Sequence, residues 1–272
     1  MRDPWKVLRD LVQSCKLRPK KRLSQNFMVD VSFLRKLVEL SKVSGEDVAL
    51  EIGTGLGFLT AELCEHARYV ISVEVDVDLA QLAHSLLAEY SNVDVLNADF
   101  LSIAVPKVDT VVSNVPYAFT SKVLLKLVEE SDKFRRAALT LQRDVVEKLT
   151  SEPGSSKYVA LSAIVRTAFT IEAGPVVPSS AFYPRPEVES QMVVLSPKKE
   201  VDVDKRLLIS LVYRLFSGRG RKLKTVLANL VDKGEMPSAI LKALPAEMLN
   251  KRVYTISTRD IIVLVSMLKQ HP

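Results

Sequence analysis

The sequence predicts an α/β fold in which a doubly wound, mainly parallel sheet is followed by a small C-terminal helical domain. Three observations predict it. Short apolar runs alternate with segments of helical spacing, which is typical of parallel strands joined by right-handed crossovers. A glycine-rich turn, 53–57, follows the first of these runs. From Asp204 onward the spacing is helical and basic, without strand alternation.

The predicted elements follow one another in a regular order. Strands are expected at 48–52, 69–74, 93–96, 110–112, 137–141 and 191–195, and helices at 58–64 and 78–90. The segment 197–202 has the composition of a linker. We therefore expect a basic N-terminal segment (1–25), a sheet domain (26–197) and a helical domain (198–272).

The composition is that of an ordinary globular protein, with 47% hydrophobic and 26% charged residues among 272. No apolar run approaches the roughly 20 residues of a membrane span, and the N-terminus lacks the apolar core of a signal peptide. Two cysteines (Cys15 and Cys64) are too few for a disulfide scaffold or a metal cluster, and the three histidines show no ligand spacing. We expect a cytoplasmic, metal-free monomer without a membrane partner.

The charge is distributed unevenly along the chain. Residues 1–25 carry eight Lys/Arg and two Asp/Glu, residues 26–197 carry 15 and 23, and residues 198–272 carry 15 and seven. A mildly acidic body is thus flanked by two basic segments. Solvated surface charge is one explanation, but two segregated basic flanks favour a polyanionic partner such as nucleic acid.

The glycine-rich turn and two acids predict a ligand site. Gly53, Gly55 and Gly57 allow positive φ and close backbone approach at the start of a helix. Glu74 ends the second predicted strand, and Asp99 follows the third. Each could be structural alone, but all lie at carboxyl ends of neighbouring strands, where a nucleotide-like ligand binds.

The glycine spacing favours one cofactor class. A dinucleotide turn usually reads G-x-G-x-x-G, which makes a dehydrogenase a poor fit. Here the spacing is G-x-G-x-G, preceded by Glu51. This pattern resembles the S-adenosylmethionine turn of class I methyltransferases, and it implies S-adenosyl-L-methionine as the cofactor.

A second motif, Asn114-Val115-Pro116-Tyr117, follows the fourth predicted strand. It resembles the [D/N/S]-P-P-[Y/F/W] motif of methyltransferases that modify exocyclic amines. Hydrogen bonds from an adenine amine to the Asn114 side-chain oxygen and the Val115 carbonyl would favour a tetrahedral, nucleophilic nitrogen. Pro116 would stiffen the turn, and Tyr117 would offer a face for stacking. A simple strand-ending turn is the alternative.

Seven segments in order extend the resemblance: KKRLSQNFMVD (20–30), EIGTGLGFLT (51–60), VEVD (73–76), NADF (97–100), NVPY (114–117), LQRDVVEKL (141–149) and PSSAFYPRPEVES (178–190). Together they resemble the ribosomal RNA adenine dimethyltransferase family, the KsgA-like enzymes with a Rossmann-like methyltransferase fold. The resemblance covers roughly residues 18–196 well and the helical tail more loosely. It implies that the sheet domain is catalytic and that the helical domain binds RNA.

The resemblance also implies roles for single residues. The cofactor contacts would come from Asn26, Met28, Gly53, Glu74, Asp99 and Asn114. Gly53 would line the methionine part, Glu74 the ribose, and Asp99 the adenine amine. Phe182 would stack on the target base opposite Tyr117, which fits an unstacked adenine. The alternative for Phe182 is a loop aromatic that covers the sheet edge.

Two segments depart from the family pattern. Where the family often has Tyr-Gly-Arg-Leu-Ser or Tyr-Ser-Arg-Leu-Ser, this chain has Tyr-Val-Ala-Leu-Ser, with Ala160 in place of the arginine. The family's Phe followed closely by Arg-Arg-Lys is looser here, in the segment 216–222. The remaining cations, Arg219, Arg221, Lys222 and Lys224, still suggest a phosphate-contact patch.

The resemblance implies S-adenosylmethionine-dependent methylation of the exocyclic amine of adenine in small-subunit ribosomal RNA. The substrate would be adjacent adenines of a 3′-terminal hairpin loop in a precursor particle, during ribosome biogenesis. Two alternatives stay open. One is a large-subunit ribosomal RNA adenine methyltransferase of the resistance type. The other is a non-catalytic nucleic-acid-binding factor on the same fold.

Overall fold

The computed structural model describes residues 3–14, 19–20, 23, 25–199 and 203–270. Cys15, His271 and the end of the predicted linker, 200–202, lie outside these residues. The chain forms two compact units. Unit 1 comprises Met1–Lys126, Glu130–Val146 and Ile171–Pro197, and unit 2 comprises Leu127–Glu129, Glu147–Thr170 and Lys198–Pro272. The second unit thus draws on 147–170 as well as on the C-terminal segment, unlike the division expected from the sequence.

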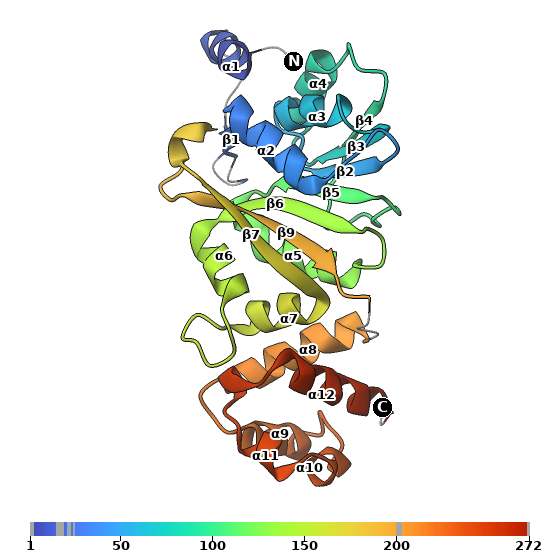
Figure 1. Ribbon diagram of the computed structural model, residues 1–272, viewed down its shortest axis with the longest axis vertical. Coiled ribbons are helices and arrows are strands. Elements are labelled where there is room, and N and C mark those ends of the chain that lie inside the picture. The colour runs from blue at the N-terminus through green and yellow to red at the C-terminus, as the bar shows by residue number, and fades with distance from the viewer. Residues whose placement is uncertain (1–2, 15–18, 21–22, 24, 200–202, 271–272) are drawn as a thin grey trace. The chain divides into compact units, whose positions relative to one another are not determined.

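The central sheet has seven strands in the order β4-β3-β2-β5-β6-β9-β7 (Figure 1). The strands are β2 (Val48–Ile52), β3 (Tyr69–Glu74), β4 (Val93–Asn97), β5 (Thr110–Asn114), β6 (Arg136–Gln142), β7 (Phe169–Val177) and β9 (Ser190–Pro197). The pairs β2–β3, β2–β5, β3–β4 and β5–β6 are parallel, and β6–β9 is antiparallel. The predicted doubly wound, mainly parallel sheet is confirmed.

The parallel register brings several strand ends to one edge of the sheet. Glu74 of β3 pairs with Asn97 of β4, and Ile52 of β2 pairs with Val73. Asn114 is the last residue of β5. Because all these strands run in the same direction, the segments that follow them gather at a common edge.

Two short strands form a second, antiparallel sheet that, in the described part of the chain, is not hydrogen-bonded to the main one. It pairs β1 (Phe27–Met28) with β8 (Phe182–Tyr183), and Met28 stands opposite Phe182. The segment before the glycine turn is thereby joined to a segment far along the chain.

The helices before and between these strands are α1 (Pro4–Gln13), α2 (Val31–Ser41), α3 (Phe58–Cys64), α4 (Val77–Leu86), α5 (Thr120–Glu129) and α6 (Arg143–Thr150). Asp30 and Asp76 cap α2 and α4, since each side chain accepts a hydrogen bond from a backbone amide two residues on. Leu8, Leu34 and Phe58 of α1, α2 and α3 join one apolar cluster with Val112 of β5.

The structure departs from the predicted elements in two ways. The helix expected at 78–90 ends at Leu86, because the Tyr90 amide bonds the Leu87 carbonyl in a turn. Elements that the sequence did not predict include α1, α2, α6, β1, β7 and β8. β7 contains Gly174 and Pro175, which are tolerated at a sheet edge but weaken a strand signal.

Unit 2 is helical in its C-terminal part, as expected. Its helices are α7 (Ala160–Ala168), α8 (Lys205–Phe216), α9 (Leu223–Asp232), α10 (Ala239–Ala243), α11 (Ala246–Asn250) and α12 (Thr258–Gln270). Asp204 caps α8 by accepting a hydrogen bond from the Leu207 amide. None of the helices in the described ranges is long and apolar enough to cross a membrane.

Candidate active site

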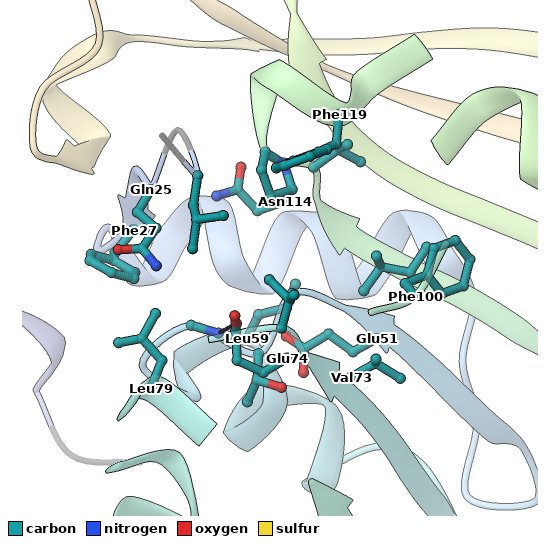
Figure 2. Close-up of a pocket in the computed structure, with 18 of the residues that line it drawn as sticks. Gln25, Phe27, Glu51, Leu59, Val73, Glu74, Leu79, Phe100, Asn114 and Phe119 are labelled. Atoms are coloured by element: carbon teal, nitrogen blue, oxygen red, sulfur yellow. Dashed lines mark hydrogen bonds between the residues drawn. The ribbon is translucent and has the colours of Figure 1, made fainter. Parts of the chain in front are cut away.

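A pocket lies in unit 1 where β2, β3, β4 and β5 end (Figure 2). The predicted residues that line it are Asn26, Met28, Gly53, Glu74, Asp99, Asn114, Val115, Pro116 and Tyr117. In Figure 2, Asn114 and Phe119 lie on one side of the pocket and Glu51 and Glu74 on the opposite side. The strand ends therefore gather side chains from segments that are far apart in the sequence.

The glycine turn forms part of the pocket wall. Gly53, Gly55 and Gly57 have φ values of 83°, 56° and 75°, which side-chain-bearing residues rarely adopt. A Cβ atom on Gly55 would lie 3.2 Å from the Phe27 ring. The turn thus needs glycine both for its backbone conformation and for the close approach of β1.

Glu74 is held by backbone amides at the end of β3. Its two carboxylate oxygens accept hydrogen bonds from the Gly55 and Asp76 amides, each at 2.9 Å. Burial raises the pKa of Glu74, although these two amides favour its charged form. The carboxylate is therefore fixed in orientation and remains a hydrogen-bond acceptor at the pocket.

Glu51 is fully buried beside the pocket. Its Oε2 atom accepts hydrogen bonds from the Thr60 and Ser72 hydroxyls at 2.5 and 2.6 Å. Its Oε1 atom has no hydrogen-bond partner among the described residues. Burial, opposed by the two hydroxyls, raises the pKa of Glu51 to about 8. One carboxylate oxygen is thus anchored while the other has unused bonding capacity.

Asp99 lies in the turn after β4 and is exposed. Its carboxylate accepts hydrogen bonds from the Leu101 amide at 2.9 Å and the Ser102 hydroxyl at 3.3 Å. These bonds fold the turn back on itself and orient Asp99 at the pocket.

Asn114 ends β5 with its amide group at the pocket. Its Nδ2 atom donates to the Asn26 carbonyl at 2.9 Å. Its Oδ1 atom is buried, and no described residue donates to it. Since buried polar atoms are normally paired, this oxygen marks a position where a ligand donor would bind.

Tyr117 follows at the start of the next turn, and its ring is partly buried. Its hydroxyl lies 2.7 Å from the Ser190 hydroxyl, which is fully buried. Burial raises the pKa of Tyr117, although the Ser190 hydroxyl opposes this. The phenol therefore stays neutral and is held from β9 while its ring lines the pocket.

Phe182 lies elsewhere. Its side chain is 2% exposed and belongs to the same apolar cluster as Met28 and Leu34. It does not line the pocket, whereas Met28, its partner across the small sheet, does. Stacking of Phe182 on a base stays a prediction.

The protein family follows from comparison with known proteins. The family model described as ribosomal RNA adenine dimethylase matches residues 16–262. The chain belongs to this family. The resemblance identified from the sequence motifs is therefore confirmed.

Individual members of the ribosomal RNA adenine dimethylase family are similar over nearly the whole chain. A probable ribosomal RNA small subunit methyltransferase A of Methanopyrus kandleri is 37% identical over 244 residues, covering 87% of each chain. The ribosomal RNA small subunit methyltransferase A of Bacillus mycoides is 31% identical over 279 residues, covering 97% of this chain and 96% of its own. The expectation of a methyltransferase agrees with both.

The fold is also similar to that of a solved structure. A dimethyladenosine transferase from Plasmodium falciparum superposes with a TM-score of 0.76 over 89% of this chain and 96% of that chain, at 23% identity. The expected Rossmann-like methyltransferase fold is confirmed by this likeness.

In this member of the family, the four predicted phosphate-contact cations differ in their surroundings. Arg221, Lys222 and Lys224 are exposed at the start of α9. Arg219 instead donates from its guanidinium to the carbonyls of Ser155, Ser156 and Tyr158 at 2.7 to 3.1 Å. It also lies 5.5 Å from the centre of the Tyr254 ring. Arg219 therefore fastens a loop within unit 2.

The motifs did not assign several pocket residues of this family member. Phe100 and Phe119 line the pocket, and Gln25 does so while donating to Asp76 at 2.8 Å. The sequence could have indicated Phe100 as a pocket residue, because it directly follows Asp99. No signal in one sequence places Gln25 beside Asp76. Within the described ranges, no group of three or more His, Cys, Asp or Glu side chains could hold a metal ion.

Proposed function

We propose that this protein methylates the exocyclic amine of adenine in small-subunit ribosomal RNA, using S-adenosylmethionine. Family membership and the names of the relatives support the reaction class and the RNA substrate. The single observation that carries the chemistry is the buried Asn114 Oδ1, which lines the pocket and lacks a donor among the described residues.

The pocket residues fit S-adenosylmethionine. Gly53 and Gly55 have no side chain, which lets a ligand lie against their backbone. Glu74 would accept hydrogen bonds from the ribose and Asp99 from the adenine amine. Met28 of β1 and Asn26, the residue just before β1, would also contact the cofactor. When bound, S-adenosylmethionine supplies a methyl group on a positively charged sulfur, which is the electrophile of the transfer.

Asn114 and Val115 would prepare the target amine. An adenine amine is a poor nucleophile because its lone pair is delocalised into the ring. Asn114 Oδ1 and the Val115 carbonyl would accept its two hydrogens and favour a tetrahedral nitrogen with a localised lone pair. No strong base is needed, because the nitrogen proton becomes acidic once the methyl group is attached. Catalysis would then be mainly positioning and electrostatics.

Aromatic side chains would hold the base. Pro116 stiffens the turn, and the Tyr117 ring lines the pocket with its hydroxyl bonded to Ser190. Phe119, three residues after Pro116, is a further pocket aromatic. Phe182 would take part only after its side chain turned out of the apolar cluster in which it is buried.

The RNA would be bound through cations of unit 2. Arg221, Lys222 and Lys224 are exposed and could contact phosphates, whereas the guanidinium of Arg219 is engaged with backbone carbonyls. The proposed substrate is a pair of adjacent adenines in a 3′-terminal hairpin loop, presented by a small-subunit precursor particle to a monomeric enzyme.

Methyl transfer to isolated ribosomal particles tests the proposal. Small-subunit particles that lack the modification, incubated with the protein and labelled S-adenosylmethionine, should acquire methylated adenine in their RNA. Large-subunit particles should not. Labelling of the large-subunit RNA alone would instead identify the resistance-type activity. Binding of both particles without any transfer would support the non-catalytic factor.

A further inference from the structure

Lys126 of α5 makes three interactions with one turn. Its ammonium group donates to the carbonyl oxygens of Leu101 and Ile103, at 3.3 and 2.5 Å. It also lies 5.4 Å from the centre of the Phe100 ring, within the range of a cation–π interaction. The Lys126 ammonium thus contacts two backbone carbonyls and the face of the Phe100 ring in the segment that follows β4.

That turn forms one end of the pocket. Asp99, Phe100 and Leu101 all line the pocket. Within the turn, Asp99 accepts from the Leu101 amide, and the Ser102 amide donates to the Asp99 carbonyl at 2.9 Å. A shift of the carbonyls that Lys126 holds would therefore move Asp99 with them.

The connection between β4 and β5, residues 98–109, forms neither a helix nor a strand. Its two ends are attached to the sheet, since the Ala98 and Asp109 amides donate to carbonyls of β3 and β2, and Phe100 is buried. Between these ends, the Lys126 ammonium donates from a regular helix to the Leu101 and Ile103 carbonyls. It thereby attaches the 101–103 part of the turn to α5.

We propose that Lys126 is a positioning residue that sets the adenine-binding end of the cofactor site. This inference rests on the proposed function, in which Asp99 accepts a hydrogen bond from the cofactor's adenine amine. Lys126 does not itself line the pocket. It acts by holding the 99–103 turn, so that the Asp99 carboxylate and the Phe100 ring keep their positions at the pocket.

Calorimetric binding of two ligands to the full-length protein tests this role. S-adenosylhomocysteine carries the adenine amine, and S-inosylhomocysteine has an oxygen at that position. Lys126→Met keeps the length of the side chain and removes the charge and the donors. The matched control is Lys122→Met, because Lys122 is exposed one turn earlier on the same helix.

Lys126→Met should weaken S-adenosylhomocysteine binding by roughly 10- to 100-fold, the range typical of one hydrogen bond to a charged group. Binding of S-inosylhomocysteine should change much less, so the preference for adenine should shrink. Lys126→Arg should restore most of the preference for adenine. Lys122→Met should behave as wild type. A purely structural role would weaken both ligands equally, and that result would overturn the proposal, as would unchanged binding.

Hydrogen exchange in the ligand-free protein gives a second readout that does not depend on the cofactor. The Leu101 and Ser102 amides should exchange faster in Lys126→Met than in the Lys122→Met control, and equal exchange would refute the attachment. Should Lys126→Met not fold, Lys126→Gln replaces it, with a smaller loss expected. If the wild-type protein bound neither ligand, the proposed function would fail, and the exchange result would still judge whether Lys126 holds the turn.

Discussion

At the scale of single residues, two unpaired oxygens distinguish the pocket from an ordinary strand end. Asn114 Oδ1 and Glu51 Oε1 are both buried without a donor among the described residues. In the interior such atoms cost stability, which natural proteins accept mainly at functional positions. The two oxygens belong to different strands. Asn114 Oδ1 marks a place at which a ligand could donate, whereas the Glu51 carboxyl, which keeps its proton up to about pH 8, could donate to a ligand from Oε1.

Glu51 should make the stability of the protein depend on pH. Burial raises the pKa of Glu51 to about 8 from its ordinary value of 4.5. Its contribution to stability is therefore complete below pH 4.5 and is lost as the pH rises to about 8, because the unfolded chain ionises first. Glu51→Gln cannot titrate. Relative to wild type, it should gain on the order of a few kcal/mol in unfolding free energy between pH 5 and pH 9.

Urea unfolding of the wild-type protein and Glu51→Gln at both pH values checks this. Glu46→Gln, an exposed glutamate before β2, serves as the control and should follow the wild type. Parallel pH dependence in wild type and Glu51→Gln would show that Glu51 is ionised in the folded state.

Tyr117→Phe should affect stability more than catalysis. The substitution leaves the fully buried Ser190 hydroxyl without its tyrosine partner, which should cost about 1–3 kcal/mol of unfolding free energy. The phenyl ring still offers a face to the base, so the methylation rate should stay within a few-fold. Tyr117→Ala should lose most of the rate. Chemical unfolding and single-turnover assays measure the two effects, and a rate collapse in Tyr117→Phe would assign a chemical role to the hydroxyl.

The sequence predicts part of the site because topology and chemistry coincide there. Gly53, Glu74, Asp99 and Asn114 follow successive parallel strands, whose ends must meet at one edge of the sheet. The position of Phe182 could not be predicted in the same way. It depends on the β1–β8 pairing, which joins distant segments with no local signal.

At the scale of elements, the apolar runs in the sequence predict the central strands of the sheet well and the edge strands and outer helices poorly. The prediction for 48–52 coincides with β2, because a buried parallel strand is a nearly continuous apolar run, broken here by Glu51 alone. β7 contains a glycine and a proline, and α1 precedes the first recognisable motif. Pairing partners and packing decide those elements, and neither is visible in local spacing.

Substitutions of two cations near α9 should distinguish a structural residue from an RNA-binding one. Arg219→Ala removes a guanidinium that three carbonyls share, so it should lower the unfolding free energy by about 2 kcal/mol or more. Lys224→Ala removes an exposed side chain and should leave stability within about 0.5 kcal/mol. Denaturant unfolding compares the two. Equal stability of both variants would mean that the Arg219 contacts contribute nothing.

At the scale of the whole molecule, the two units are interleaved along the chain. Unit 2 takes residues 147–170 from between segments of unit 1. Truncation before Lys198 would therefore remove α8 to α12 and leave α7 without the rest of its unit. The sequence suggested a simple boundary there, because a composition change marks a linker but does not show which earlier segments pack with the tail.

Charge reversal on unit 2 tests RNA binding without cutting the chain. The affinity for small-subunit particles should fall steeply with salt, because cations at phosphates release counterions. Lys222→Glu with Lys224→Glu should lower the slope of log affinity against log salt by roughly one per lysine. Lys242→Glu, exposed on α10, is the matched control. An unchanged slope in the double variant would place the RNA elsewhere.

The central claim is that the Asn114 amide oxygen activates the target amine. The most direct test is the single-turnover rate of adenine methylation in small-subunit particles, at saturating cofactor, with nucleosides identified by mass spectrometry. Asn114→Ala should lower this rate by about 10²-fold or more, comparable to the loss of one preorganised polar contact, while particle affinity stays nearly constant. A near wild-type rate in Asn114→Ala, or methyl groups found on a base other than adenine, would contradict the account.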